Sequence, residues 1–467
     1  MERTLRVGVV GGGMFFDDII GPALHDFQRG GFAGALSSIG MSHYAPRVAD
    51  IRIEFAAIGT RSAARGTADL IRGAFLDEFP AAELKAYYGE TVWQEMIAQE
   101  RLDVLLVASP DHLHTQPILD ALAAGLHVIT EKPLCLKTSE ADRIIETAAR
   151  AGLVVAADMH KRYDPMNRKL FLDVVPRMGE INYVEAVLEE PLQVATEVFQ
   201  WVEQSNPFAY VGCHWLDVIG HYMGVKPKAL YATGERMLLE NWDRYVREIA
   251  ILKQKDLTTF SRHDAIHAWD SMNVNITYDN GMRGDYNNAW INPAEFEGAV
   301  NQELEVYGVL GRGFVDQQDR GFRETITGDG TRTRNPTFGG RIRHMGRHTE
   351  LFGYGKASLA AGLLAIARVK FLGEGIADLG TTYPDARSQH SITQIIEAAT
   401  AVAELNHHYF GERGAAPVTA TFTEDSTTLI DPLGGNRELY RRLIRYRRVG
   451  PPRPTGSMTP PLPHPFT

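Results

Sequence analysis

A short apolar strand followed at once by three glycines opens the chain and constrains its fold more than any other feature. The run TLRVGVV, residues 4–10, reads as a buried strand, and GGGMFFDDIIGPAL reads as a tight turn that leads into a helix. Backbone amides in such a turn form a cradle for pyrophosphate. The fingerprint is Gly11-x-Gly13-x-x-Phe16, without the usual third glycine, so a plain tight turn is the alternative. Gly11, Gly13, Met14 and Phe15 are the predicted cofactor contacts.

Alternation of strands and helices continues to about residue 160. Strands such as LDVLLVASP and HVITEKP are separated by helical segments such as HTQPILDALAAG and SEADRIIETAARAG, which predicts a doubly wound parallel sheet of the Rossmann type. Ligands bind at the carboxyl ends of such strands, where Ser109, Pro110, Glu131 and Lys132 stand. The glycine- and serine-rich stretch from His25 to Ile51 predicts a loop insertion.

The end of the second strand, RIEFAAIGTRS, bears on the choice of cofactor. An Asp or Glu there would bind the ribose 2′-hydroxyl of NAD, but the chain has Thr60, Arg61 and Ser62. Two hydroxyls and a guanidinium suit a 2′-phosphate. The residues favour NADP; the alternative is NAD, with Arg61 stacked on adenine or facing solvent.

After about Arg162 the pattern changes to longer strands of alternating polarity. Segments such as INYVEAVLEEP and SMNVNITYDNGMRGDYNNAWI indicate a large, open, mostly antiparallel sheet flanked by helices, hence an α+β domain. We predict a dinucleotide-binding domain over residues 1–160, a substrate-binding and oligomerisation domain over 161–448, and a proline-rich tail over 449–467.

Composition excludes several other classes of protein. A formal charge of −10 and a pI near 5.9 argue against wrapping of nucleic acid. Only Cys135 and Cys213 occur, which fits a reducing compartment and two small buried side chains. No leader segment is recognisable, and the apolar segment from Ala357 is interrupted by Arg368, so we expect a cytoplasmic protein without a membrane anchor.

One segment of the second domain, GCHWLDVIGHYMG, places His214, Asp217 and His221 on one helical face. Two histidines and a carboxylate are able to bind a metal, but a single helix without a further ligand motif makes general acid/base chemistry the better interpretation. No metal site is predicted.

Taken together, these motifs make the chain similar to the Gfo/Idh/MocA family, named for glucose-fructose oxidoreductase and inositol dehydrogenase. The resemblance rests on VGVVGGG, ASPDHLHTQPILDALAAGLHVITEKPL, DMHKRYDP and GCHWLDVIGHYMG. It implies nicotinamide-dependent hydride transfer at a hydroxyl or carbonyl of a sugar, cyclitol or related polyol. It also implies that Lys132, Asp217 and His221 reach the reacting carbon, and that the enzyme is a homodimer or homotetramer.

Elementary chemistry assigns roles to the three predicted catalytic residues. Removal of hydride from an alcohol leaves a proton and develops negative charge on oxygen, so a base and a nearby cation both help. We predict His221 as the base, with Asp217 orienting it or helping to relay the proton, and Lys132 as the stabilising cation. Pro133 fixes the backbone as the chain leaves the strand.

Weaker candidates surround these residues. The resemblance places His114 near the cofactor, although a packing role is equally supported. His160, Arg162, Trp201 and His214 are predicted to contact substrate, Trp201 by stacking on a sugar ring. The arginine-rich segment from Gly328 fits either an anionic substrate or a neighbouring subunit.

Two other functions remain open at this point. One is a redox-assisted glycoside-processing enzyme that retains its cofactor. The other is a nucleotide-sensing regulator without catalysis.

Overall fold

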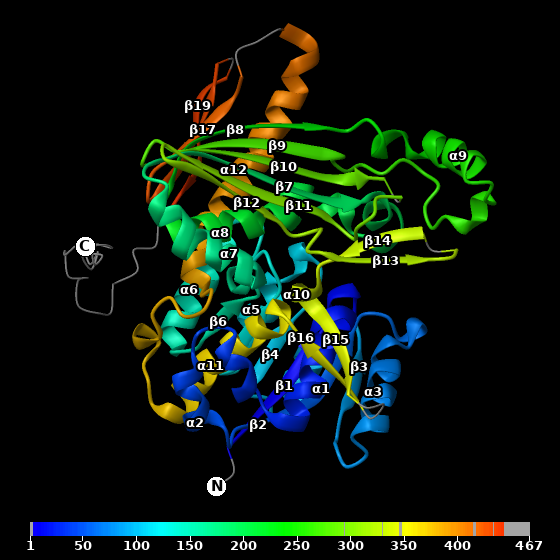
Figure 1. Ribbon diagram of the computed structural model, residues 1–467, viewed down its shortest axis with the longest axis vertical. Helices are drawn as coiled ribbons and strands as arrows, with labels where there is room; N and C mark the ends of the chain where they lie inside the picture. The colour runs from blue at the N-terminus through cyan, green and yellow to red at the C-terminus, as the bar shows by residue number, and fades with distance from the viewer. Residues whose placement is uncertain are drawn as a thin grey trace, which may run out of the picture.

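The computed structural model describes residues 3–293, 295–328, 330–344, 348–413, 417–432 and 434–442. The predicted tail, residues 449–467, lies outside the described residues. Two sheets dominate the fold, a six-stranded sheet near the N-terminus and a nine-stranded sheet at the opposite end of the molecule (Figure 1). The two-sheet prediction is therefore confirmed.

The first sheet is parallel throughout and has the strand order β3-β2-β1-β4-β5-β6. Its central strands are buried without interruption, as expected for a sheet covered on both faces. The bounds are β1 Thr4–Val10, β2 Arg52–Thr60, β3 Lys85–Tyr88, β4 Val104–Val107, β5 His127–Thr130 and β6 Val155–Ala157.

Helices pack on both faces of this sheet. One face carries α4 (Val92–Gln99), α5 (Thr115–Ala123) and α6 (Thr138–Ala151), and the other carries α1 (Gly21–Gly30) and α3 (Thr67–Glu78). The stretch between α1 and β2 is not the loop we predicted, because it folds into short helical turns and α2 (Ala45–Val48) that bury Leu36 and Val48.

Helix α11, Tyr354–Leu372, comes late in the sequence but packs in the core of the first sheet. A Cβ at Gly362 would lie 3.1 Å from the Ile129 side chain of β5 and 3.5 Å from Ala156 of β6. This close approach explains the small residues of the segment. The predicted division at residue 160 therefore describes chain order, whereas the first core also includes a helix from the second part of the chain.

The second sheet has the strand order β12-β11-β7-β10-β9-β8-β17-β18-β19 and is antiparallel except where β10 pairs with β7. Its bounds are β7 Ile181–Pro191, β8 Pro227–Glu235, β9 Ser271–Tyr278, β10 Arg283–Asn292, β11 Asn301–Gly308, β12 Gly311–Asp316, β17 Thr419–Phe422, β18 Ser426–Asp431 and β19 Gly435–Arg441.

Helices cover the face of this sheet that looks toward the first sheet (Figure 1). Val184, Ala186 and Leu188 of β7 alternate onto that face and pack in one core with side chains of α8 (Cys213–Met223) and α12 (Ala386–Arg413). Helix α9, Trp242–Leu252, packs with a separate apolar cluster around Trp290.

Two hairpins lie below the second sheet, and the later one runs down in front of the first domain (Figure 1). They are β13 (Phe322–Ile326) with β14 (Gly330–Arg334), and β15 (Gly340–His344) with β16 (His348–Phe352), joined by α10 (Pro336–Gly339). The Arg341 guanidinium donates to the Asp17 carbonyl at 2.6 Å, next to the glycine turn. The arginine-rich segment therefore contacts the first domain of its own chain.

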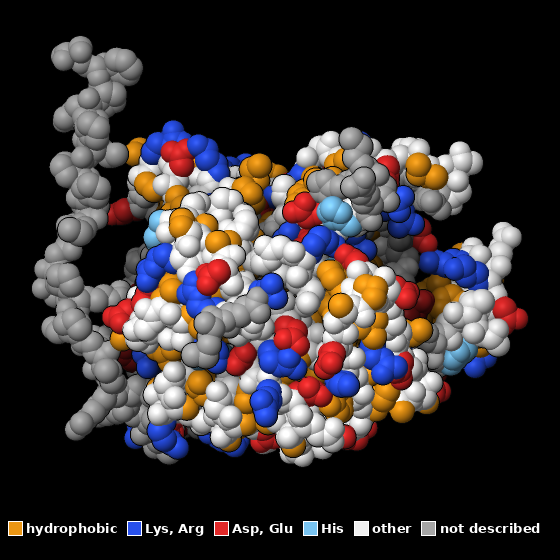
Figure 2. All heavy atoms as spheres, turned by 90° about the horizontal axis from the view of Figure 1, so that it is seen from below, with side chains coloured by type: hydrophobic (Ala, Val, Ile, Leu, Met, Phe, Trp, Pro, Cys, Tyr) orange, Lys and Arg blue, Asp and Glu red, His pale blue; other side chains and the backbone are white. Residues whose placement is uncertain are grey.

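The face seen from below in Figure 2 mixes acidic, basic and apolar side chains. Within the described part of the chain, no helix combines the length and the apolar composition that a membrane crossing requires.

Candidate active site

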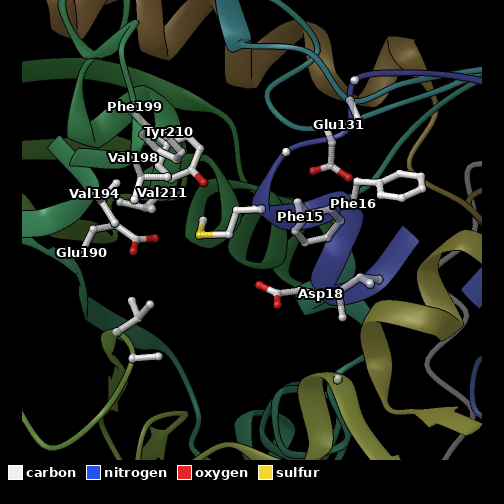
Figure 3. Close-up of a pocket in the computed structure, with 18 of the residues that line it drawn as sticks. Phe15, Phe16, Asp18, Glu131, Glu190, Val194, Val198, Phe199, Tyr210 and Val211 are labelled. Carbon is white, nitrogen blue, oxygen red and sulfur yellow. The ribbon is translucent and has the colours of Figure 1, made fainter. Parts of the chain in front are cut away.

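A cavity of about 2040 Å³ lies between the two sheets and is the candidate active site. It exceeds the roughly 300–1,000 Å³ of ordinary ligand pockets and is large enough for a dinucleotide together with a substrate. Figure 3 shows Phe15 and Asp18 on one side of it, with Glu190, Val194 and Tyr210 on the other.

The glycine turn lies at the cavity wall, as predicted. Gly11 has φ of +108°, and a Cβ there would come within 2.1 Å of the Ala108 carbonyl oxygen, so only glycine fits between β1 and the end of β4. A Cβ at Gly13 would meet nothing within 4 Å, which leaves room for a phosphate group against the backbone. The other cofactor candidates that line the cavity are Met14, Phe15, Thr60, Arg61, Ser62, Ser109, Pro110, Glu131 and Lys132.

Several polar atoms of the cavity-lining residues are buried without a hydrogen-bond partner. They are Thr60 Oγ1, Ser109 Oγ, Glu131 Oε1, His160 Nδ1 and His214 Nδ1. Buried polar atoms are normally paired, and those that are not often mark a ligand site. Their positions at the strand ends and near Lys132 fit a nicotinamide dinucleotide with a small polar substrate.

His114 does not line the cavity, and its side chain instead connects two loops. Its side chain is fully buried, with Nδ1 2.8 Å from the Pro133 carbonyl and Nε2 2.7 Å from the Ser109 carbonyl. These contacts connect the loops that follow β4 and β5. Of the two roles that the sequence left open for His114, these contacts support the packing role, in which it holds two loops that line the cavity.

Lys132 points into the cavity wall formed by the second domain. Its Nζ is 3.5 Å from the centre of the Tyr210 ring and donates to the Tyr210 carbonyl at 2.7 Å. The ammonium group carries three donors, so donors remain for a substrate oxygen. The Lys132–Pro133 peptide bond is cis.

His214, at the start of α8, lies close to Lys132 because it follows Tyr210 by four residues in one continuous helical segment. Its ring centroid is 4.4 Å from that of His160, and both side chains line the cavity. Burial, together with the charges of Lys132 and Lys161, holds the pKa of both imidazoles well below 6.5. Burial therefore favours the neutral form of both imidazoles, in which one ring nitrogen is an acceptor.

Asp217 and His221 do not line the cavity, contrary to our prediction. Asp217 accepts two hydrogen bonds of 2.5 Å from Arg162 and one of 2.9 Å from Gln389, and its side chain is 1% exposed. His221 packs edge-on against Tyr222 at 4.7 Å, and its pKa is lowered to about 4, mainly by burial. The predicted orientation of His221 by Asp217 is wrong, since Asp217 is bound to Arg162.

Arg162 was also predicted to contact substrate and instead serves the packing of the second domain. It lies in the turn His160–Tyr163, where His160 faces His214 and Arg162 pairs with Asp217. Tyr222 adds a hydrogen bond of 2.6 Å to the Arg162 carbonyl. The turn is thus fixed against α8 at three points, and the ion pair positions the two histidines.

Aromatic side chains form two walls of the cavity. Phe15, Phe338 and Tyr354 surround His160, with ring centroids between 4.9 and 5.7 Å from it. On the other side Trp201 lies in the wall, stacked on Phe199 at 4.4 Å and close to Tyr210 at 5.9 Å. Trp201 is therefore placed where a sugar ring is able to contact it.

The cavity also holds buried charged residues, of which the sequence prediction missed Glu190. Burial raises the pKa of Glu190 to about 7, and it lowers that of Lys161 to about 7. Asp111 is buried, accepts a hydrogen bond from Ser205 at 2.7 Å, and has a raised pKa because of its burial. Period-two alternation in β7 was the available signal for Glu190, since it continues the buried series Val184, Ala186, Leu188.

Carboxyl groups also lie behind Lys132. Burial raises the pKa of Glu131 well above its usual value, and the charge of Asp158 adds to the effect. Burial likewise raises the pKa of Asp158 to about 6. Among the described residues no cluster of His, Cys, Asp and Glu has the arrangement of a metal site.

The comparison with known families agrees with this arrangement. Residues 5–159 match an oxidoreductase family with an NAD-binding Rossmann fold, and residues 176–312 match the GFO/IDH/MocA C-terminal domain. Together the two matches cover more than half of the 467 residues. The chain belongs to the GFO/IDH/MocA oxidoreductase family.

Among curated relatives, D-glucoside 3-dehydrogenase of Escherichia coli is 32% identical over 152 residues, 31% of this chain and 43% of that protein. Myo-inositol 2-dehydrogenase of Thermotoga maritima is 24% identical over 225 residues, 48% of this chain and 59% of that protein. The alignments thus span less than two thirds of either relative.

Solved structures of this family share the fold over nearly the whole chain. GenD2 from gentamicin A biosynthesis, in complex with NAD, has a TM-score of 0.60 at 17% identity and covers 91% of this chain and 97% of its own. The scyllo-inositol dehydrogenase of Lactobacillus casei with bound NAD(H) and scyllo-inositol has a TM-score of 0.57 at 15% identity, covering 86% and 98%.

Proposed function

We propose that this protein is a nicotinamide-dependent dehydrogenase that oxidises a hydroxyl, or reduces the corresponding carbonyl, of a sugar, cyclitol or related polyol. The proposal rests on one observation above others: Lys132 from the end of β5 and His214 from α8 line the same cavity as the glycine turn. Relatives named as glucoside and inositol dehydrogenases support the substrate class.

In the proposed reaction His214 takes the place that we predicted for His221. The neutral imidazole accepts the proton of the substrate hydroxyl, and negative charge developing on the substrate oxygen favours the imidazolium that forms. Lys132 donates a hydrogen bond to the same oxygen and stabilises that charge. A bound nicotinamide supplies the hydride acceptor or donor.

Burial of the site contributes to the same chemistry. His160, Lys132 and His214 are each at most 6% exposed, so bulk water is largely excluded from the groups that handle the proton. The Arg162–Asp217 pair keeps α8 and the His160 turn in register, which fixes the imidazole of His214 relative to Lys132.

NADP is the proposed cofactor. Thr60, Arg61 and Ser62 line the cavity beyond the end of β2, and Arg65 lies beside them in the same wall. The Arg61 guanidinium has a distant, exposed partner, with Nε 3.8 Å from Glu90 Oε1. Two cations and two hydroxyls suit a 2′-phosphate.

A spectrophotometric screen tests both parts of the proposal. Purified protein is assayed against inositols, aldoses, uronic acids and glycosides with NAD and with NADP. We expect turnover of at least one neutral sugar or cyclitol, with a lower KM for NADP. A clear preference for NAD would refute the cofactor assignment, and no turnover of any compound with either cofactor would refute the dehydrogenase.

A second candidate is redox-assisted glycoside processing with a cofactor that is not released. One observation favours it: α10 and β15 lie over the glycine turn, with Arg341 bonded to the Asp17 carbonyl at 2.6 Å and Phe338 6.2 Å from Phe15. Such a cover slows cofactor exchange. A nicotinamide that copurifies with the protein and is not consumed during turnover would favour this candidate over the dehydrogenase.

A further inference from the structure

Glu190 occupies a position of β7 at which the alternation of buried and exposed residues predicts an apolar side chain. Val184, Ala186 and Leu188 alternate onto the helix-covered face of the strand and are buried, and Glu190 is the next residue on that face. Pairing with β10 becomes irregular between Ala289 and Asn292, beside this end of β7. The strand therefore turns a carboxylate inward at the edge of the cavity.

Glu190 is a largely buried residue of the cavity wall, and its carboxylate has no hydrogen-bond or ion-pair partner among the described residues. Its residue is 8% exposed, and within the described ranges it makes no hydrogen bond or ion pair. Burial raises the pKa of Glu190 to about 7, while the charges of Lys132 and Lys161 act in the opposite direction. An unpaired buried carboxylate is costly, and such groups concentrate at functional sites.

The surroundings of Glu190 place it in the substrate half of the cavity. Figure 3 shows it near Val194, Val198 and Val211, across the cavity from Phe15 and Asp18. Lys132, which is proposed to contact the reacting oxygen, is its strongest charged neighbour. The glycine turn lies on the opposite wall, so a dinucleotide seated there leaves Glu190 free for the substrate.

Lys161 differs from Glu190 in that its donors are already used. Its ammonium donates to the side chains of Gln302 and Gln317, and it lies 4.9 Å from the Trp215 ring centre. The amino group of Lys161 is therefore held by two glutamines, whereas the side-chain oxygens of Glu190 have no hydrogen-bond donor among the described residues.

We propose that Glu190 is the specificity-determining residue of the substrate site and accepts hydrogen bonds from two adjacent hydroxyls of a neutral polyol. A carboxylate has two acceptor oxygens and no donor, which matches a vicinal diol. A carboxylate substituent on the substrate at this point is repelled by the carboxylate of Glu190. The site therefore selects neutral sugars or cyclitols over uronic acids.

This inference rests on the proposed function, and the experiment separates the two. KM and kcat are measured for the neutral sugar or cyclitol that the screen shows to be turned over fastest, and for D-glucuronate. Wild type is compared with Glu190→Gln and Glu190→Asp, and with Glu185→Gln as the matched control, because Glu185 is an exposed glutamate of the same strand β7 that does not line the cavity. Thermal unfolding of each variant checks the fold.

We expect Glu190→Gln to raise KM for the neutral substrate at least tenfold while kcat changes by less than threefold. In the same variant the preference for the neutral substrate over D-glucuronate, measured as the ratio of kcat/KM values, falls at least tenfold. Glu190→Asp has a smaller effect on this ratio, and Glu185→Gln has none. Unchanged KM in a folded Glu190→Gln protein, or a wild-type preference for D-glucuronate, would overturn the specificity role alone. Absence of wild-type turnover with any compound would overturn the dehydrogenase and this inference together.

Discussion

The two halves of the cavity differ in how their residues are arranged along the chain. In the first half they follow the ends of parallel strands, as Gly11 follows β1, Ser109 follows β4 and Lys132 follows β5. In the second half they come from a strand, a short turn and a helix, represented by Glu190, His160 and His214. Strand ends at one edge of a sheet must lie together, whereas a helix brings only part of its length to a site.

Helix α8 illustrates this difference. His214, Asp217 and His221 recur at helical spacing, so their sequence positions are equivalent by periodicity. Seven residues nevertheless advance a helix by about 10 Å, which separates His214 from His221 by more than a side chain can span. Only the first turn of α8 reaches the cavity, and the next turn pairs with Arg162.

The largest expected effect on activity comes from a residue in the first half of the cavity, Lys132. Replacing Lys132 with Met removes the cation that stabilises the substrate oxygen and should lower kcat by at least about 10³-fold. Steady-state kinetics measure the loss, with Lys137→Met as an exposed control that should keep normal turnover. Near-normal turnover of the Lys132 variant would show that this residue is not required for catalysis.

Two variants in α8 test whether only the first turn of this helix takes part in the reaction. His214→Gln removes the proposed base and should lower kcat by about 10²- to 10³-fold. His221→Gln, seven residues later, should change kcat by less than about threefold, since this side chain does not line the cavity. If His221→Gln instead lowered the single-turnover or steady-state rate more than His214→Gln does, His221 would be the base, as the sequence predicted.

The buried ion pair behind the site should affect stability more than chemistry. Asp217→Asn leaves the Arg162 guanidinium buried without its countercharge and should lower the free energy of unfolding by about 3 kcal/mol or more. Asp243→Asn, at an exposed carboxylate of α9, serves as the control. Urea unfolding gives the difference, and equal stability of the two variants would contradict the structural role.

The smallest predicted effect lies inside the first sheet, away from the cavity. Burial lowers the pKa of His127 to about 4, and its Nδ1 accepts the Val154 amide at 3.0 Å, which requires a neutral ring. Because the folded pKa lies below the unfolded value of about 6.5, this stability is present above pH 6.5 and is lost toward pH 4.

Between pH 7 and pH 5 the contribution of His127 should fall by about 2 kcal/mol. The measurement compares urea unfolding of wild type and His127→Gln at both pH values, which cancels the titration of other groups. The stability gap between the two proteins is expected to shrink at pH 5; a gap that stays constant would argue against a neutral, buried imidazole.

Sequence by itself determined the parts of this protein that depend on local pattern. Continuous apolar strands, the glycine turn and the residues at strand ends predicted the parallel sheet and the position of Lys132, because a parallel sheet gathers its carboxyl ends at one edge. Alternation likewise predicted the antiparallel second sheet.

Only the tertiary structure decided which helical and inter-domain residues meet the cavity. Periodicity predicts which face of a helix a side chain lies on, but not which turn of the helix contacts the cavity. The sequence alone therefore could not decide whether His214 or His221 lines the cavity. The partner of Asp217 lies 55 residues away at Arg162, and α11 returns to the first sheet from beyond residue 350. Contacts between distant segments depend on packing of the whole core, which no local spacing records.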